Sequence, residues 1–329
     1  MVDFTQRAAG SASEALMNIL CPALDQAVAA HAKAEYEKTR GSGEGDVAKK
    51  RIGSGYIGLK CARALAFKFH KFPVEERDGP VNKGELQRHA ESGHWTEAKT
   101  ADWLRLVGFQ IRTDTGRLNT FGKPEQIGWK AARDPETGQY QMAGEVDGVI
   151  DAVPENLKSI IKVPAIWESK KGTDKKWKKF CKEKVKGADP KYFGQLQSNM
   201  AHMGVEQTVF SMLNLDNMKY YFEIVALDVQ YAQGLVDRAV NVIRSTDPFE
   251  LPPLCRSADD FEGKYCDWHG QCQLGLKLQP PEPQIATMVM LPADATSEQV
   301  AQAFGNLMNK APPTPQTAPK RPVFNPNWK

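Results

Sequence analysis

The sequence predicts an α/β (α+β) fold, with a central mixed β-sheet flanked by helices and a helical extension at the N-terminus. Two observations carry this prediction. Apolar residues recur at helical spacing before and after the middle of the chain, and in the middle the pattern changes to the alternation typical of strands. Helical and strand segments in this order fold as one sheet with helices packed on it.

The helices of the N-terminal part come first. We predict them over residues 12–39, 54–69 and 82–109. Ser54 is a candidate cap for the second helix, and Gly108 can end the third. The apolar residues expected on the buried face of the third helix are Leu86, Trp103, Leu104 and Val107.

The strands follow. We predict them over residues 140–153, 159–172, 207–215 and 219–227. A helix over 189–205, opened by the pair Asp189 and Pro190, separates the second strand from the third, and a helix over 229–245 closes the fold. The chain is expected to divide into an N-terminal helical extension, a core and a Pro-rich, largely disordered tail, over residues 1–50, 51–277 and 278–329.

Bulk composition excludes several classes of protein. The chain has 329 residues, 41% hydrophobic and 25% charged, with a net charge of only +3, as in an ordinary globular protein. It has neither a run of 18 apolar residues nor a basic and apolar leader at its start. We therefore expect no membrane segment and a cytoplasmic location, where the six cysteines would be thiols or metal ligands rather than disulfides.

Positive charge is concentrated in one segment. Between Ser169 and Lys191 there are ten lysines against two aspartates and one glutamate. Such a cluster is either a solvated face or a contact surface for a phosphate backbone, and Trp177 within it can stack on an unpaired base or pack on the protein. The candidate DNA-binding residues are Lys171, Lys175, Lys176, Trp177, Lys178 and Lys179.

Two acids and a lysine stand on neighbouring predicted strands. Asp147 lies in GEVDGVID, and Glu168 and Lys170 lie in WESKK. If the strands form a hairpin, both carboxylates lie side by side, and Lys170 shares the face of Glu168 because strand side chains alternate. Carboxylate oxygens suit Mg²⁺ or Mn²⁺, and Lys170 can orient a water molecule or stabilise developing charge.

These motifs, in this order, resemble the PD-(D/E)xK nuclease superfamily. The segments GEVDGVID, WESKKG and YFGQLQSNM are similar to those of its RecB-like exonuclease branch, which includes phage exonucleases and CRISPR-associated adaptation nucleases. The resemblance covers roughly Ser54 to Cys272. It implies a restriction-endonuclease-like core and a metal-dependent deoxyribonuclease, acting at DNA ends in recombination, repair or phage DNA processing.

The resemblance also implies roles for further residues. Ser169 would offer a backbone carbonyl to the metal, and Tyr192 and Gln195 would contact DNA or position the scissile phosphate. His94, on an early helix, would be a metal ligand. Glu97 is the alternative, as a ligand or a supporting carboxylate, and His89 is a weaker candidate than either.

Cysteines near the two ends of the core form a second candidate metal site. In the resembled branch, an upstream Cys in a C-x-R helix and three C-terminal Cys hold a [4Fe–4S] cluster, and the candidates here are Cys61, Cys255, Cys266 and Cys272. Gly263 stands where the branch usually has the first of the three C-terminal cysteines. Zinc, with His269 as a substitute ligand, and plain buried thiols stay open as alternatives.

Other classes of function stay open as well. One alternative to a nuclease is a non-catalytic DNA-binding or adaptor protein on a degenerate nuclease fold. DNA ends or single strands are the expected partner, and the tail is expected to recruit a single-strand annealing or recombination protein.

Overall fold

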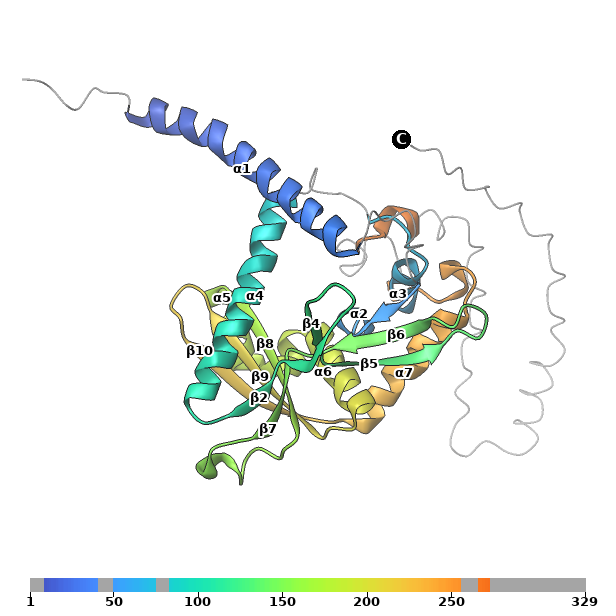
Figure 1. The fold of residues 1–329 in the computed structure, drawn as a ribbon. Helices are drawn as coiled ribbons and strands as arrows, with labels where there is room; N and C mark the ends of the chain where they lie inside the picture. Colours follow the sequence, from blue (N-terminus) through green and yellow to red (C-terminus); the bar gives the residue numbers. More distant parts are fainter. Residues whose placement is uncertain (1–8, 41–49, 75–82, 256–265, 273–329) are drawn as a thin grey trace, which may run out of the picture. The chain divides into compact units, whose positions relative to one another are not determined.

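The computed structural model describes residues 9–40, 50–74, 83–255 and 266–272, all within the unit Met1–Gly275 (Figure 1). The predicted tail lies outside the described residues, and the predicted division of the chain stays a prediction. The helices are α1 (Ala9–Arg40), α2 (Ser54–Ile57), α3 (Ala62–Phe69), α4 (Lys83–Leu106), α5 (Asp174–Ala188), α6 (Pro190–Met203) and α7 (Val229–Arg244), with 3-10 turns at Glu155–Leu157 and Pro248–Glu250. The strands are β1 (Ile52–Gly53), β2 (Gln110–Arg112), β3 (Asp114–Leu118), β4 (Pro124–Gln126), β5 (Gly128–Arg133), β6 (Tyr140–Glu145), β7 (Gly148–Ala152), β8 (Ala165–Gly172), β9 (Gln207–Asn214) and β10 (Tyr220–Ala226).

The largest sheet has five strands in the order β10-β9-β8-β7-β2. Strands β8 and β9 are parallel, whereas the other neighbouring pairs are antiparallel, so the sheet is mixed. Helices α5 and α6 make the connection between the two parallel strands, as parallel pairing requires a long crossover. The predicted α/β architecture, a mixed sheet flanked by helices, is confirmed.

Each face of this sheet is covered by a different set of helices. On one face Phe180 of α5 and Leu196 of α6 pack against Ile166 and Phe210 of the sheet. On the other face, Leu104 of α4 packs in a separate cluster that includes Trp167 and Val209. The sheet is thus the middle layer of three, which is why the first half of its central strand β8, from Ala165 to Glu168, is buried.

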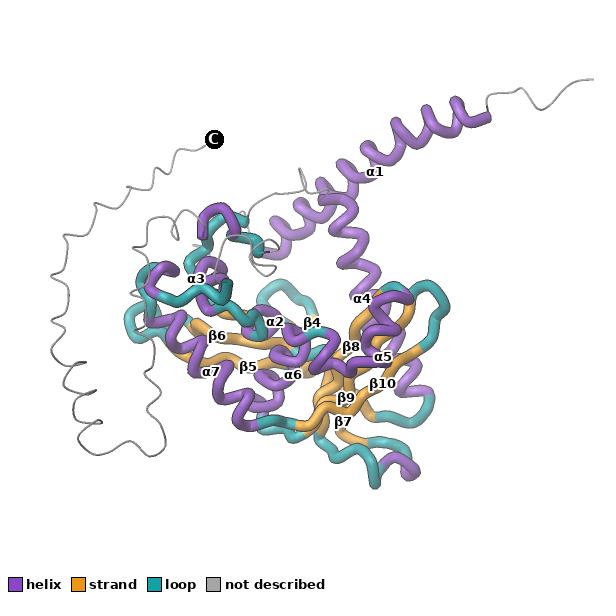
Figure 2. Tube along the Cα trace, turned by 180° about the vertical axis from the view of Figure 1, so that it is seen from behind, coloured by secondary structure: helices purple, strands orange, loops and turns teal. Residues whose placement is uncertain are grey.

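A second, smaller sheet of order β1-β6-β5 lies beside the first. Trp129 of β5 and Met142 of β6 pack against Leu235 and Ala239 of α7. In Figure 2 this sheet is seen from behind, with α6 and α7 running beside β5 and β6. The strands β3 and β4 form a separate hairpin. None of the strands from Gln110 to Arg133 was predicted from the sequence.

The predicted strand over 140–153 is wrong in one respect, because it is two strands in two sheets. Strand β6 ends at Glu145 and β7 begins at Gly148. Between them the N–H of Val146 donates to the carbonyl of Ile127, and the Val146 side chain is buried in the core. The chain therefore changes sheet at Asp147, which places that carboxylate at the break rather than within a strand.

Two other predicted boundaries are wrong. The strand predicted over 159–172 begins at Ala165, since Pro164 has no N–H for a ladder and the N–H of Lys162 donates to the Gln207 side chain instead. The helix predicted over 54–69 is broken between α2 and α3. There Cys61 is the N-cap of α3 and its sulfur accepts from the N–H of Ala64.

The lysine-rich segment forms a helix that was not predicted from the sequence. Helix α5 runs through it and buries Phe180 and Val185, with Trp177 and Cys181 packed beside them. The spacing of these apolar residues is helical, so the signal was present beneath the lysines. No helix among the described residues is long and apolar enough to cross a lipid bilayer.

Helix α4 is only partly buried along the face predicted for it. Leu104 is buried as expected, but Leu86, Trp103 and Val107 are exposed. The residues that do face the sheet include the small Thr96 and Thr100, whose hydroxyls donate to carbonyls one turn earlier. Near its start, α4 crosses α1, where Arg88 pairs with Asp25 at 2.6 Å.

Candidate active site

The two acids and the lysine predicted from the sequence meet where β7 and β8 pair. Gly148 pairs with Trp167 in an antiparallel register, so the next residues, Asp147 and Glu168, lie across from each other. The N–H of Ser169 donates to Asp147 Oδ2 at 2.7 Å, which fixes that carboxylate against β8. The structure therefore brings these side chains together, as the predicted hairpin requires.

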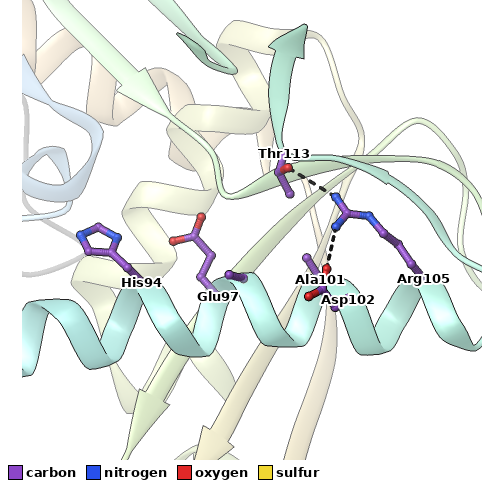
Figure 3. Close-up of a pocket in the computed structure, with 7 residues that line it drawn as sticks. His94, Glu97, Ala101, Asp102, Arg105 and Thr113 are labelled. Carbon is purple, nitrogen blue, oxygen red and sulfur yellow. Dashed lines mark hydrogen bonds and ion pairs between the residues drawn. The ribbon is translucent and has the colours of Figure 1, made fainter. Parts of the chain in front are cut away.

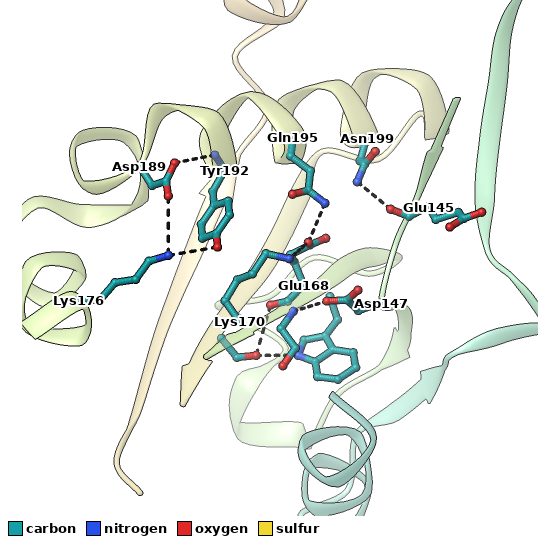
Figure 4. Close-up of polar contacts among 12 residues, drawn as sticks. Glu145, Asp147, Glu168, Lys170, Lys176, Asp189, Tyr192, Gln195 and Asn199 are labelled. Atoms are coloured by element: carbon teal, nitrogen blue, oxygen red, sulfur yellow. Dashed lines mark hydrogen bonds and ion pairs between the residues drawn. The ribbon is translucent and has the colours of Figure 1, made fainter. Parts of the chain in front are cut away.

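Glu168 is the centre of this group. Its side chain is fully buried, and its Oε1 accepts from the Lys170 ammonium and, at 2.9 Å, from Nε2 of Gln195 on α6 (Figure 4). The second oxygen, Oε2, is buried and finds no hydrogen-bond partner among the described protein groups. A buried carboxylate with one oxygen unsatisfied costs folding free energy, so it marks a site kept for a ligand rather than for stability.

The pKa values of Glu168 and Lys170 are both shifted by burial and by the neighbouring charges. Burial raises the pKa of Glu168 to about 7, and the Asp147 carboxylate adds to the rise while Lys170 opposes it. Burial lowers the pKa of Lys170, but Glu168 and Asp147 outweigh it and raise that pKa above its ordinary value. Lys170 therefore stays an ammonium at neutral pH. A further positive charge, such as a bound cation, would stabilise the ionised form of the crowded carboxylates beside it.

Helix α4 supplies a third acid, Glu97, which the sequence ranked behind His94. Burial raises the pKa of Glu97 to about 7, with a further rise from Asp147 and an opposing effect of Lys170. The side chains of His94 and Glu97 line a pocket of about 260 Å³, and Arg105 lines it as well (Figure 3). His94 is exposed, whereas Glu97 is half-buried and interacts with the Asp147 group. Of the two, Glu97 is the better-placed candidate ligand.

His89, the weakest of the candidates, is engaged elsewhere. Its ring lies 3.9 Å from Glu85, and its backbone carbonyl accepts from the Lys171 ammonium at 2.8 Å. Lys171 also donates to the Ser92 hydroxyl, so it ties β8 to α4. Burial lowers the pKa of Lys171. These contacts indicate a structural role for a lysine that was expected to bind DNA.

Stability should depend on pH through Glu97. Its folded pKa lies above its ordinary value of 4.5, so stability falls as pH rises from about 4.5 to about 7 and stays lower above. With EDTA at pH 8, we expect Glu97→Gln to be more stable than wild type, by under about 1 kcal/mol because the group is half-exposed. The gain should vanish at pH 4. Urea unfolding measures it, with exposed Glu91→Gln as the control; an unchanged profile for Glu97→Gln would contradict this electrostatic account.

Tyr192 on α6 lies between two lysines. The Lys170 ammonium is 5.3 Å from its ring centre and that of Lys176 is 4.6 Å away. Lys176 also donates to the Tyr192 hydroxyl at 3.1 Å and lies 4.0 Å from Asp189 (Figure 4). Cation–π contacts of this kind hold an ammonium in place without neutralising it. Tyr192 therefore lies between Lys170, which pairs with Glu168, and Lys176 at the start of α5.

The remaining residues expected to bind DNA are used in different ways. Lys178 pairs with Asp174 at 2.6 Å, and Lys179 donates to the carbonyl of Ala188 at 2.8 Å. Lys175 is exposed. Trp177 packs against the core beneath α5, which is the alternative to base stacking that the sequence left open.

One residue beside the site was not singled out from the sequence. Asn199 is fully buried, its Nδ2 donates to the carbonyl of Glu145 at 3.3 Å, and its Oδ1 accepts from the Trp129 indole at 2.9 Å. It therefore holds the chain just before Asp147, at the point where the chain changes sheet. Its position one turn after Gln195 on α6 was the available signal, since residues four apart share a helix face.

The acids fit a hard divalent cation by donor type and by the unsatisfied Oε2 of Glu168. As they stand, no three His, Cys, Asp or Glu side chains in the described ranges form a group that could hold a metal ion. Asp147 is turned to the Ser169 N–H and Glu168 to Lys170. Metal binding would require these carboxylates to rotate toward one another.

Three of the four candidate cysteines interact around the start of α3. Burial raises the pKa of Cys266, and Cys61 and Cys272 add to the rise. The Cys61 sulfur accepts from the N–H of Leu254, and the Cys272 sulfur from the buried Arg63 guanidinium at 3.7 Å. Thiols with N–H donors aimed at them suit a metal–sulfur centre, although no metal-holding arrangement is formed in this part of the described chain.

The mixed sheet, with its β7–β8 hairpin and the parallel strand β9 joined through α5 and α6, defines a restriction-endonuclease-like fold. No protein-family model matches the chain, and no curated protein matches it. Similar solved structures include an alkaline exonuclease, LHK-Exo, from Laribacter hongkongensis, with 12% identity over 59% of this chain and 87% of that one, and a TM-score of 0.33. That protein in complex with dAMP gives a TM-score of 0.34 at 12% identity and the same coverage. SSO0001 gives 0.40 at 12% identity over 78% of this chain and 97% of that one.

Proposed function

We propose that the protein is a DNA nuclease of the PD-(D/E)xK superfamily, of its RecB-like branch, which hydrolyses phosphodiester bonds at DNA ends with Mg²⁺ or Mn²⁺. One observation supports this most. The fully buried Glu168, with an unsatisfied oxygen, lies across from Asp147 and beside the Lys170 ammonium. A structural role would have favoured satisfied or apolar groups at this position.

Each side chain has a separate task in this scheme. Asp147, Glu168 and Glu97 would hold the metal, together with the carbonyl of Ser169, and the bound ion would supply an activated water and neutralise charge on the phosphate. Lys170 places a fixed ammonium beside the reacting phosphate, where it stabilises developing negative charge. His94 stays an alternative ligand on α4.

The groups on α6 orient this machinery. Gln195 donates to Oε1 of Glu168, so the carboxylate keeps one orientation. Tyr192 holds Lys170 on one side and Lys176 on the other. The substrate backbone would then run past the end of β8 toward the first turns of α5, where Lys175 and Lys176 face it.

Cleavage of linear and circular DNA by the purified protein tests the proposal. We expect degradation of linear duplexes or single strands with Mg²⁺ or Mn²⁺, no degradation with EDTA, and survival of closed circles. Salt-sensitive binding without cleavage under either ion would instead show a non-catalytic DNA-binding protein. Cleavage of closed circles would show cutting within the strand rather than at ends.

Lys176 offers a test of the DNA path alone. We expect Lys176→Ala to weaken binding of a duplex of about 20 base pairs. The slope of log affinity against log salt should also fall by about one unit, because one phosphate contact is lost. Lys162→Ala is the control, since that lysine is exposed and pairs with Glu206. Binding measured by fluorescence anisotropy in Ca²⁺ or EDTA keeps this readout separate from cleavage. Equal slopes for Lys176→Ala and wild type would remove Lys176 from the path.

The cysteines support a second proposal, which is independent of the first. We infer that Cys61, Cys255, Cys266 and Cys272 hold a [4Fe–4S] cluster that fastens α3 to the C-terminal part of the unit. Anaerobically purified protein should absorb near roughly 400 nm and contain about four iron atoms per chain, and Cys272→Ser should lose both. Bound zinc without absorbance would favour the zinc alternative, and neither metal would leave plain thiols. A role of the tail in recruiting a single-strand annealing protein stays a prediction.

A further inference from the structure

Helix α4 and strand β10 present a row of exposed apolar side chains that the proposed function does not use. Leu106 is 83% exposed, Trp95 51% and Phe222 47%. We call this surface the edge patch, and its members are the exposed Trp95, Trp103, Leu106, Phe222 and Ile224 together with the half-buried Tyr220. Their exposed parts come to roughly 500 Å², which is at the upper end of what monomeric proteins show in one apolar patch.

The four aromatic members of the edge patch form one continuous chain of ring contacts rather than scattered residues. The rings of Trp95 and Trp103 are 6.4 Å apart, those of Trp103 and Tyr220 6.3 Å, and those of Tyr220 and Phe222 5.3 Å. The Tyr220 hydroxyl lies 2.8 Å from the hydroxyl of Thr100, which joins β10 to α4. Side chains already held in place lose little rotamer freedom when a partner covers them.

Strand β10 is also an edge strand, and within the part of the chain that the structure describes no further strand pairs with its free side. It is the last strand of the sheet and pairs with β9 over seven residues without a register shift. Its sequence, YYFEIVA, has no proline and no lysine. The one charge, Glu223, is occupied by the N–H of Val185 and the hydroxyl of Tyr221. Natural proteins guard such an edge or cover it.

The chemistry of the edge patch favours a protein partner over nucleic acid. The lysine within the row, Lys99, lies 3.7 Å from Asp102, so little positive charge is left to attract a phosphate backbone. Leu106 and Ile224 offer aliphatic surface, which stacks poorly on bases. The lysines that could contact a DNA backbone lie on α5. Helix α5 packs on one face of the sheet, and α4 packs on the opposite face.

We propose that the edge patch binds a second copy of this chain, with β10 of each copy pairing antiparallel to the other. A strand that pairs antiparallel with itself forms a two-fold contact, so each patch meets its own copy. Phe222 and Ile224 stand on one face of β10, and two-fold pairing gathers them with their counterparts. Two such patches approach the roughly 1,200 Å² of the smallest stable interfaces, and the new backbone hydrogen bonds add to that.

Sedimentation velocity of the full chain over about 0.5–50 μM tests this inference. We expect a dimer for wild type and a monomer for Phe222→Lys/Ile224→Lys, with the dissociation constant raised by at least about 100-fold. Leu106→Lys changes the same patch without altering the sheet and should weaken the dimer as well. Leu118→Lys is the control, because that residue is 69% exposed and lies on the β3–β4 hairpin, which is separate from the five-stranded sheet. Circular dichroism confirms that each variant is folded.

Three results would overturn the inference. A monomeric wild type over the whole range would mean that no second copy binds. A dimer that persists in both folded patch variants would place the interface elsewhere. Monomeric wild type whose tryptophan fluorescence is quenched by oligo-dT, with the quenching lost in Leu106→Lys, would assign the patch to nucleic acid instead. None of these readouts depends on cleavage, so they leave the proposed nuclease activity to its own test.

Discussion

Replacing Glu168 by glutamine should reduce DNA cleavage by at least about 10³-fold, which corresponds to roughly 4 kcal/mol in the activation free energy. The change keeps the shape of the side chain and its contact with Gln195, so the fold should persist. What is lost is the negative charge of the one carboxylate that lies between Lys170 and Asp147. A neutral amide is a poor ligand for Mg²⁺ and leaves the ammonium without its partner.

The same variant separates metal binding from catalysis. Wild-type protein should unfold at a higher temperature as Mg²⁺ or Mn²⁺ is added, because a ligand that binds only the folded state stabilises it by mass action. The Glu168→Gln variant should show little of this shift. Glu206→Gln, an exposed glutamate that pairs with Lys162, is the matched control and should behave as wild type in both measurements.

Two outcomes would count against the site. If Glu168→Gln cleaves DNA at the wild-type rate, the β7–β8 acids are not the catalytic centre. If cleavage is lost but the metal-dependent shift in unfolding temperature is unchanged, then Glu168 acts in the reaction without holding the ion. In that case Asp147 and Glu97 become the ligands to test next.

The sequence could predict much of this site because its parts are local. Alternation along a strand places Glu168 and Lys170 on one face, and the connection from the strand of Asp147 is long enough for the hairpin that brings the acids together. The helix that carries Tyr192 and Gln195 was predicted within two residues of its observed ends. Patterns of period two or 3.6 are properties of a few neighbouring residues, so they can be recognised without the fold.

What the sequence could not show depends on contacts between distant segments. The preference for His94 over Glu97 depended on a motif, whereas the direction each side chain takes is set by how α4 lies on the sheet. The change of sheet at Asp147 depends on Ile127 and on Asn199, which are 20 and 52 residues away along the chain. The dense lysines of α5 concealed its apolar face, because mean hydropathy there is low even though the spacing is helical.

The helices behind the site cross so closely that one added methyl group should destabilise the protein. A Cβ at Gly194 of α6 would lie 2.5 Å from the Cα of Gly58, and a Cβ at Gly58 would lie 2.5 Å from the Lys191 carbonyl oxygen. Both obstacles are backbone atoms, which cannot turn aside as a flexible side chain can. We expect Gly194→Ala to lower the free energy of unfolding by about 2–4 kcal/mol.

Cleavage should fall with stability in this variant, because α6 also carries Gln195 and Tyr192. A shift of the helix away from α2 would move both relative to Glu168. Urea unfolding gives the first effect, and cleavage measured where the variant is still fully folded gives the second. Gly234→Ala is the matched control, since that residue also lies within a helix but faces open space, and alanine there should add about 0.5–1 kcal/mol. If Gly194→Ala unfolds at the wild-type urea concentration, the two backbones do not approach as closely as this crossing requires, and α6 is then positioned by its side chains alone.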